Sequence, residues 1–547
     1  MILSTDLIIK LKKLFIEKKF TEIEFSIESL GELKKLPNNI LNLYAVSKAL
    51  NPNSKIDDFK LSAYCFEKIY LADKSNREVF YNLIVASVKA VDFTYLEKHL
   101  IEEHRKDKEN PKILEALAKM NFFYNNMKEA SIYYEKLVSL KPEYANVWSS
   151  FIASLNYHYH YDQKKYLEFC RKFDKTIKIE TDNFKSSLIK NKKIRVGFLS
   201  ADFKNHSVSL FLREILNKLD KTEFELFGLS NLQLTFHDKM TMSLKTIFDK
   251  WYDIFDLTDE ELVKLARTCN LDIIIDLSGH TYQNRINILK ARCAPIQISW
   301  LGYCNTSGVK NIDYLIADPN LIKKEEHSLY SEKILYMPNI WNALSKPNNL
   351  PSIRNDKEKN VFTFGSFNNF QKISLETIKL WSKILNEKNS RLILKTSTPF
   401  DNQKSKEILL KKFEIEKVDL KKIIVLNRKN TFEEHLDCYN KVDLLLDTFP
   451  YPGVTTSFQS WVMGVPVLTM KGFNFNSRCG ESINYNLNFP EFVAKNEKDY
   501  FDKSLDIKEK NNIDISYRLA LREKALKSNL FDTETFTKDF VGLIKSL

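Results

Sequence analysis

The sequence lacks any long apolar run, and this absence excludes a membrane-spanning helix. No stretch of the 547 residues reaches the roughly 18 uninterrupted apolar residues that a span needs. The opening segment, MILSTDLIIKLKKLFIEKKF, does not fit a signal peptide, because its charges follow the apolar residues and no small-residue cleavage site appears. We therefore expect a soluble chain with no membrane span.

Cysteine is scarce and scattered, which argues against a structural zinc site. The seven cysteines include no CxxC pair, the spacing that zinc sites commonly use. An odd, dispersed set in a chain of this length is typical of reduced thiols. We therefore expect a cytoplasmic protein.

Several ligand-binding signatures are also missing. There is no GxxxxGK[ST] phosphate loop, and no GxGxxG follows a strand, so a nicotinamide enzyme is disfavoured. No spaced carboxylate pair resembles a metal-dependent DxD site, and Asp437 and Asp443 fit the surface of a helix equally well. The net charge is +12, but no long Lys/Arg block occurs, which favours a Lys-rich surface over nucleic-acid binding.

The first third of the sequence, residues 1–185, predicts helices. Gly and Pro are scarce there, and apolar residues recur at spacings of three and four. The clearest unit is a 34-residue tetratricopeptide-like pattern, formed by Leu114, Leu117, Ala118, Ala130, Tyr134 and Pro142. Trp148 lies 34 residues after Leu114, where the next unit places its large residue. This register favours stacked helical repeats over an ordinary helical bundle.

The remaining sequence alternates short β-branched runs with helix-like stretches, which indicates parallel sheets. One series lies within residues 193–345 and a second within 360–500, followed by C-terminal helices over 501–547. The expected strands are 194–200, 224–230, 271–279, 296–302 and 314–319, then 361–367, 391–397, 422–428, 443–449 and 465–470. Two Rossmann-like lobes are the architecture called GT-B, and ligands of such sheets bind beyond the carboxyl ends of the strands.

Polar motifs follow the strands of the first series. His206 lies in DFKNHSVS, where it could hydrogen-bond a sugar or take part in proton transfer. The alternative is a helix-capping turn, with Ser207 or Asn205 as the cap. Gly302 and Asn305 lie in APIQISWLGYCNTSG, whose glycines allow the backbone to approach a ligand, although tight turns between strands have the same composition.

The second series has three such motifs. GSFNNFQKIS contains Asn369, and its Lys372 lies near a helix start, where an anionic ligand such as a diphosphate would offset the unfavourable dipole. An exposed lysine is the alternative in so Lys-rich a chain. TFEEH places His435 at another helix start. In DTFPYPGVTT, Gly453, Thr455 and Thr456 occupy a strand-to-helix turn whose N–H groups favour an anion.

Taken together, the order of these motifs resembles the O-GlcNAc transferase and SPINDLY family. The blocks are DFxNHSVS, SGHT, APIQxSWLGYxNTSG, DY, GSFNNxxKI, EEH, DTFPYxGxTT and MGVPVLTM. They cover roughly residues 193–500, and the upstream repeats match the domain order of the family. The resemblance implies an inverting, metal-independent protein O-glycosyltransferase of GT-B fold, with a nucleotide sugar as donor.

The resemblance also implies roles for individual residues. His206 matches a histidine of the family that faces donor and acceptor. The loop that contains Gly302 and Asn305 matches a loop of the family that lies against the sugar. Asn369 and Lys372 match groups at the diphosphate, with Lys372 and His206 as the catalytic pair. The remaining matches are His435 on the nucleobase, Gly453, Thr455 and Thr456 at the phosphates, and Gln459 at the ribose.

Three residues depart from the family pattern. Cys304 stands where the family usually has proline, Val454 where the O-GlcNAc transferases have histidine, and Gln459 where an Asp or Glu would contact the ribose. The motifs GSFNNxxKI, SGHT and HSVS are nearer to the SPINDLY branch, which includes fucosyltransferases. We therefore expect UDP-GlcNAc as the donor, with GDP-fucose or another nucleotide sugar, as in flagellin or surface-protein glycosylation, as the alternative.

Two other functions stay open at this point. One is a non-catalytic scaffold whose repeats bind a partner, and the other is a glycosyltransferase that acts on a small molecule or glycan. Retention of His206, Lys372, His435 and the two threonines favours an enzyme. Repeats usually present an extended surface to peptides, which favours a protein acceptor bound along them.

Overall fold

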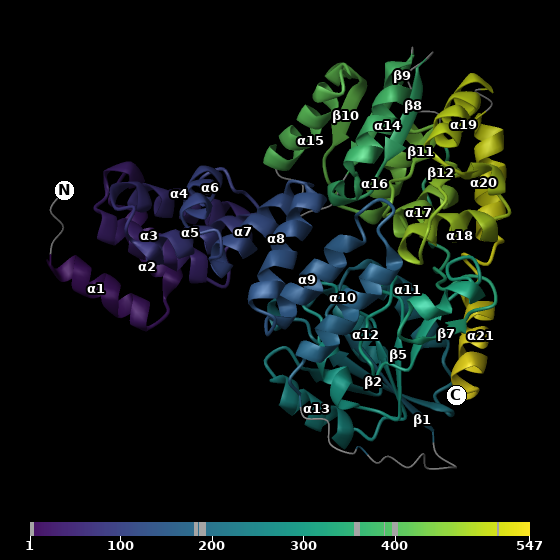
Figure 1. Cartoon of the computed structure of the whole chain (residues 1–547), viewed down its shortest axis with the longest axis horizontal. Helices are drawn as coiled ribbons and strands as arrows, with labels where there is room; N and C mark the ends of the chain where they lie inside the picture. Colours follow the sequence, from purple (N-terminus) through teal and green to yellow (C-terminus); the bar gives the residue numbers. More distant parts are fainter. Residues whose placement is uncertain are drawn as a thin grey trace. The chain divides into compact units, whose positions relative to one another are not determined.

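The computed structural model describes residues 5–179, 184, 193–354, 361–387, 389–395, 403–510 and 513–547. Contacts within the chain define two compact units. The first contains helices α1 to α8, drawn in purple and blue in Figure 1, and the second contains nearly everything from Pro142 onward. Helices α9 and α10, which lie inside the helical region expected over 1–185, thus belong to the same unit as the two sheets.

The first unit is built from helix pairs. Its helices are α1 (Thr5–Ile16), α2 (Phe20–Glu28), α3 (Asn38–Leu50), α4 (Ile56–Ala72), α5 (Arg77–Ala90), α6 (Glu97–Lys106), α7 (Pro111–Phe123) and α8 (Met127–Leu140). The α7–α8 pair buries the large and small residues of the repeat pattern, including Leu114, Ala118, Ala130 and Tyr134. The Asn110 side chain caps α7 by accepting the N–H of Ile113, so the helix starts where the pattern predicts.

The second unit contains a seven-stranded parallel sheet. Its strands are β1 (Ile194–Ser200), β2 (Phe224–Ser230), β3 (Lys250–Asp253), β4 (Ile273–Asp276), β5 (Ile296–Ser299), β6 (Tyr314–Ala317) and β7 (Lys333–Tyr336). They lie in the order β3-β2-β1-β4-β5-β6-β7. The strand order reverses beside β1, where β4 pairs on the side opposite β2. Ligands of doubly wound sheets bind at such a switch point.

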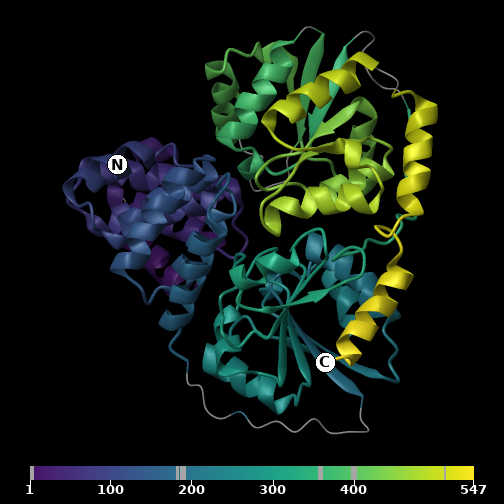
Figure 2. The same cartoon turned by 45° about the vertical axis from the view of Figure 1, so that its right-hand side comes forward.

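A second parallel sheet follows in the same unit. Its strands are β8 (Phe362–Ser366), β9 (Ser390–Lys395), β10 (Ile423–Leu426), β11 (Leu444–Leu446), β12 (Val467–Met470) and β13 (Val493–Ala494). They lie in the order β10-β9-β8-β11-β12-β13, so this sheet has its switch point between β8 and β11. The predicted fold class, helical repeats followed by two Rossmann-like lobes, is confirmed; the two lobes are separate in Figure 2.

Helices connect the strands and cover the sheets. They are α9 (Ala145–Leu155), α10 (Gln163–Thr176), α11 (Ser207–Lys218), α12 (Lys239–Ile247), α13 (Asp259–Thr268), α14 (Leu375–Asn386), α15 (Gln403–Ile415), α16 (Phe432–Asp437), α17 (Thr455–Val462) and α18 (Cys479–Asn486). Helices α11, α14 and α17 carry strong apolar faces that the core buries. None of the helices in the described ranges is both long and apolar enough to cross a membrane.

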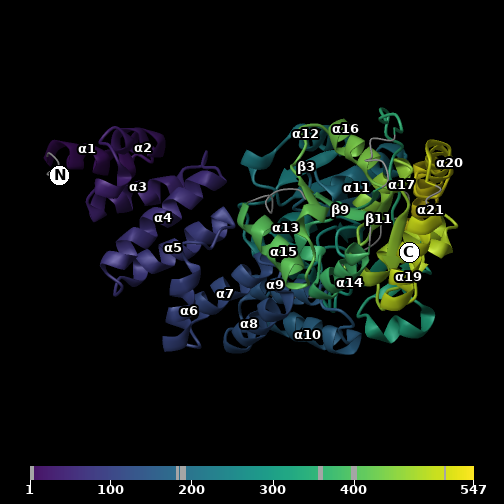
Figure 3. The same ribbon diagram turned by 90° about the horizontal axis from the view of Figure 1, so that it is seen from above.

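The C-terminal helices join the two lobes rather than standing apart. Helix α19 (Glu497–Lys510) packs on α14 and β12, α20 (Ile515–Leu526) on α17, and α21 (Thr533–Lys545) on α11 of the first lobe, as Figures 2 and 3 show in yellow. The ring of Phe540 on α21 stacks on Trp300, with centroids 4.9 Å apart. One continuous hydrophobic core therefore runs through both lobes.

We predict that α21 is needed for the stability of the second unit. Phe540→Ala should lower the free energy of unfolding by about 3–5 kcal/mol, because it opens a cavity against buried Trp300. Lys538→Ala, an exposed position on the same helix, should change it by less than about 0.5 kcal/mol. Urea unfolding of both variants tests this, and equal midpoints would contradict it.

Candidate functional site

A buried carboxylate organises the switch point of the second sheet. Asp447 follows β11, and its Oδ1 accepts the N–H groups of Thr448 (3.0 Å) and Gly453 (2.7 Å). The same oxygen accepts Asn368 Nδ2 from the loop after β8 (3.0 Å), and Oδ2 accepts Thr469 Oγ1 (2.9 Å). Burial raises the pKa of Asp447 to about 6, against these hydrogen bonds and the nearby charge of Lys372. The carboxylate thus ties the loops after β8 and β11 to each other and to strand β12.

Gly453 is required by this packing. A Cβ atom there would lie 2.3 Å from Thr456 Oγ1 and 2.6 Å from Asn368 Oδ1, closer than real contacts allow. These two atoms are themselves hydrogen-bonded, with Thr456 donating to Asn368 (2.6 Å). The loop can therefore reach the start of α17 only with glycine at this position.

Helix α17 begins at this loop with Thr455 and Thr456. Its N-cap residue, Val454, has no side-chain acceptor for the first N–H groups of the helix. Helix starts of this kind favour anions, because their N–H groups and dipole are oriented toward the ligand. The position of Thr455 and Thr456 therefore suits phosphate oxygens.

Lys372 is held beside the same loop and is not an exposed surface lysine. It ends the short 3-10 turn Phe370–Lys372, and α14 begins only at Leu375, capped by Ser374. Its ammonium donates to the Pro452 carbonyl (2.9 Å) and lies 4.0 Å from the centroid of the Tyr451 ring. Burial lowers the pKa of Lys372 to about 8, against the charge of Asp447. A cation in such surroundings favours an anionic ligand.

His435 is fixed in one tautomer at the side of the site. Its Nδ1 lies 2.8 Å from the ammonium of Lys395 on β9, and its Nε2 lies 2.9 Å from Gln459 Oε1 on α17. Since an ammonium can only donate, Nδ1 accepts and the Nε2–H donates to Gln459. Burial and Lys395 lower the pKa of His435 to about 4, so the imidazole is neutral at physiological pH.

Two residues of the first lobe border the ends of β1 and β5. His206 itself, rather than Ser207 or Asn205, is the N-cap of α11; its backbone is extended and its Nδ1 accepts the N–H of Val208 (3.3 Å). The side chain is 44% exposed, and its Nδ1 lies 3.7 Å from the Asp202 carboxylate. Gly302 packs so closely that a Cβ atom would lie 1.9 Å from the Leu277 carbonyl oxygen.

Helices α11 and α17 pack against each other across the lobes. Phe211 and Phe458 meet edge to face, with ring centroids 5.2 Å apart. His206 is at the start of α11 and Thr455 at the start of α17. The aromatic contact therefore lies between the two helices that carry these residues. The thiol of Cys304, two residues after Gly302, also lies close enough to Lys372 to influence its pKa.

Two of the expected residues lie elsewhere in this arrangement. Asn305 is fully buried, and its amide is bonded to Asn156 (2.9 Å) and Gln163 (2.7 Å) at the ends of α9 and α10. Asn369 is exposed, whereas its neighbour Asn368 is buried in the Asp447 network. Sequence reasoning assigned no role to Asn368 or Asp447, although a buried strand runs directly into each of their loops.

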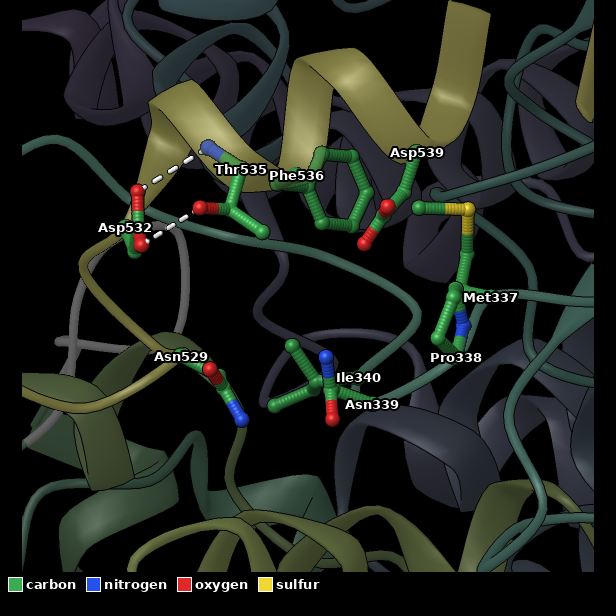
Figure 4. Close-up of a pocket in the computed structure, with 9 residues that line it drawn as sticks. All are labelled: Met337, Pro338, Asn339, Ile340, Asn529, Asp532, Thr535, Phe536 and Asp539. Atoms are coloured by element: carbon green, nitrogen blue, oxygen red, sulfur yellow. Dashed lines mark hydrogen bonds between the residues drawn. The ribbon is translucent and has the colours of Figure 1, made fainter. Parts of the chain in front are cut away.

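Over the described parts of the chain, the candidate site coincides with neither a metal-binding cluster nor the hollow beside α21. Among the described residues, no three His, Cys, Asp or Glu side chains are placed to hold a metal ion. Figure 4 shows a small hollow between the end of β7 and α21, lined by residues such as Met337, Ile340 and Phe536. Its Asp532 carboxylate caps α21 by accepting from Thr535, and none of the candidate residues lines it.

The fold, helical repeats before two Rossmann-like lobes, is the architecture of the GT-B class of glycosyltransferases. The model of glycosyl transferase family 41 matches residues 162–357 and 352–540. The chain belongs to this family.

Relatives and a solved structure agree with this assignment. The chain is 32% identical over 430 residues to a rice protein named "Probable UDP-N-acetylglucosamine--peptide N-acetylglucosaminyltransferase SPINDLY", covering 76% of this chain and 45% of that protein. The SPINDLY protein of Arabidopsis thaliana is 31% identical over 376 residues, 66% of this chain and 39% of the relative. This confirms the SPINDLY branch, and the chain spans less than half the length of these relatives. A mutant O-GlcNAc transferase from Thermobaculum terrenum has the same fold, with a TM-score of 0.80, 24% identity and coverage of 94% and 98% of the two chains.

The neighbouring asparagines provide a matched test of the Asp447 network. Asn368→Ala should lower the free energy of unfolding by about 1–3 kcal/mol, because it removes a hydrogen bond from buried Asp447 and another from Thr456. Asn369→Ala, at the exposed neighbour, should lower it less, because water replaces what an exposed side chain loses. Equal losses in urea unfolding would show that the network does not hold the loop.

Proposed function

We propose that this protein transfers a sugar from a nucleotide-diphosphate donor to Ser or Thr hydroxyls of a protein, with inversion at the sugar carbon. The observation that carries the proposal is Lys372. Its ammonium contacts the Tyr451 ring and the Pro452 carbonyl. Tyr451 and Pro452 directly precede the turn into α17, whose helix start suits phosphate. The first lobe brings His206 to the start of α11, the helix packed against α17.

The second lobe binds the nucleotide in this proposal. The neutral imidazole of His435 stacks on the nucleobase, and Gln459, which holds its Nε2–H, lies toward the ribose. Tyr439 donates from its hydroxyl to the Thr456 carbonyl (3.1 Å) and packs edge to face on His435. Base and phosphate positions are therefore linked by one buried ring. Asn369, exposed in the loop after β8, contacts the diphosphate.

The reaction needs charge stabilisation at the leaving group. As the bond between sugar and phosphate opens, negative charge grows on the diphosphate, and the Lys372 ammonium with the first N–H groups of α17 stabilises it. His206, with Asp202 close to its Nδ1, takes part in proton transfer at the acceptor hydroxyl. In this scheme the lysine and the N–H groups supply the positive charge, so transfer proceeds without a metal ion.

The donor and acceptor are proposed from the relatives and the repeats. The names of the SPINDLY relatives specify UDP-N-acetylglucosamine and a peptide, which makes UDP-GlcNAc the donor of choice, with GDP-fucose as the alternative. The acceptor protein binds along the helical repeats, as extended peptides do in such arrays. All seven cysteines are free thiols, which suits a reducing compartment such as the cytoplasm.

A donor screen tests the proposed function. UDP-GlcNAc, GDP-fucose and CMP-linked sugars are incubated with the chain and a Ser/Thr-rich peptide mixture, and nucleotide release and peptide mass are recorded. The screen is run with EDTA and with added magnesium or manganese. Transfer from UDP-GlcNAc that EDTA leaves unchanged supports the proposal. Nucleotide binding without release from any donor supports a scaffold instead, and activity restored only by metal refutes the metal-independent scheme.

We predict that Lys372 governs turnover. Lys372→Met should lower kcat by about a hundredfold to a thousandfold, because the lost charge acts on the transition state. In the wild type, kcat/KM should fall as the pH rises through about 8, since deprotonation removes the same charge, and this fall should be absent from the variant. Lys379→Met, on the exposed face of α14, is the control and should retain wild-type kcat. A folded Lys372→Met variant with more than about a third of wild-type kcat would rule out this role.

His435 should instead govern donor binding. His435→Ala should raise the donor KM roughly 5-fold to 100-fold, the range that corresponds to losing one stacked base, while kcat changes less. The reason is that stacking on the base is equally strong in the ground and transition states. His327→Ala, at an exposed histidine of the first lobe, is the control. An unchanged donor KM in steady-state kinetics would exclude stacking on His435.

A further inference from the structure

The connection between α9 and α10 is anchored to both lobes. Asn156 at its start donates to the Tyr303 hydroxyl (3.0 Å) and accepts from Asn305 (2.9 Å), both in the first lobe. Gln163 at its end donates to Asn305 (2.7 Å) and accepts from Asn474 of the second lobe (3.0 Å). The residues between these anchors are thus fixed relative to both sheets.

The anchored connection presents aromatic side chains to the loops of the second lobe. Tyr157 packs on Tyr451 with ring centroids 4.9 Å apart, and Tyr159 packs on Phe449 at 5.3 Å. His160 packs in the same way on Phe473 at 5.4 Å. The contacts with Tyr451 and Phe449 cover the loop after β11, which leads to Gly453, and the contact with Phe473 lies in the loop after β12.

Tyr451 contacts both Tyr157 and Lys372 and so connects the two residues. Its ring face lies 4.0 Å from the ammonium, and the carbonyl that the ammonium bonds belongs to the next residue, Pro452. A cation–π contact depends on ring orientation, since only the face of the ring is negative. The backbone carbonyl of Tyr451 is held by the Thr448 hydroxyl (2.7 Å), but its ring is packed against Tyr157.

We infer that Tyr157 is a positioning residue for the leaving-group cation, which it orients through the ring of Tyr451. The inference rests on the proposed function, in which Lys372 stabilises the departing diphosphate. It adds that the helical segment before the two lobes contributes to the chemistry as well as to acceptor binding. Tyr157 touches neither donor nor reacting atoms in this scheme, so its effect passes entirely through Tyr451 and Lys372.

The test is a double-mutant cycle. Tyr157→Ala should lower kcat about tenfold to a hundredfold, the scale of a displaced catalytic group, with a much smaller change in donor KM. Tyr157→Phe keeps the ring and should retain most of the activity. In the Lys372→Met background, Tyr157→Ala should cause no more than about a twofold further loss, because the group it positions is already gone. Tyr144→Ala is the control, since Tyr144 precedes the first turn of α9 and is 41% exposed.

A second readout does not need activity. Competitive acetylation of the protein over a range of pH, followed by peptide mass spectrometry, gives the pKa of Lys372 directly. Burial sets this pKa at about 8, and Tyr157→Ala should move it toward the ordinary 10.5, because the loosened Tyr451 ring admits water. Tyr144→Ala should leave it unchanged.

The outcomes separate the two proposals. If the wild type releases no nucleotide from any donor, the proposed function fails, while acetylation still shows whether Tyr157 controls the surroundings of Lys372. An active wild type with equal losses from Tyr157→Ala in both backgrounds would indicate a general structural role and overturn the inference. Unchanged kcat and an unchanged pKa of Lys372 in folded Tyr157→Ala would overturn it as well.

Discussion

The buried carboxylate of Asp447 is the interaction on which the site depends. It accepts hydrogen bonds from Asn368 after β8, from Gly453 after β11 and from Thr469 on β12, so two loops and a strand share one carboxylate. Burying a carboxylate is costly unless such donors compensate, which explains why its pKa is raised only to about 6. The carboxylate fixes the path of the chain into α17 by accepting the N–H of Gly453.

Around Asp447, buried surroundings rather than exposed ion pairs set the charge states of Lys372 and His435. The Lys372 ammonium contacts a ring face and a carbonyl, and the charge of Asp447 opposes the burial that lowers its pKa. His435 is kept neutral by burial and by the charge of Lys395, against its hydrogen bond to Gln459. Both arrangements are available only in surroundings that largely exclude water. The first lobe is aligned to them through the Phe211–Phe458 contact and the C-terminal helices.

Much of the fold could be predicted because buried parallel strands are continuous apolar runs. The expected ranges 194–200 and 224–230 coincide with β1 and β2. The unpredicted strands, β3, β7 and β13, all lie at sheet edges, and β3 and β7 have partly exposed side chains. Edge strands pair on one side only, so they lack the apolar signature of central strands. Helices α9 and α10 were grouped with the repeats because helical periodicity carries no information on which core a helix joins.

The sequence by itself determined the class of fold, the order of its parts and the positions where loops follow strands, because periodicity and motif order are local properties. It also placed Lys372, His435, Gly453 and the two threonines near the turns where strands lead into helices. Only the tertiary structure decided which neighbour is buried, Asn368 rather than Asn369, and that Asn305 bonds to the ends of α9 and α10. It alone revealed Tyr157 beneath Tyr451, since these residues are far apart in the chain and their contact arises from the packing of α9 and α10 on the lobes.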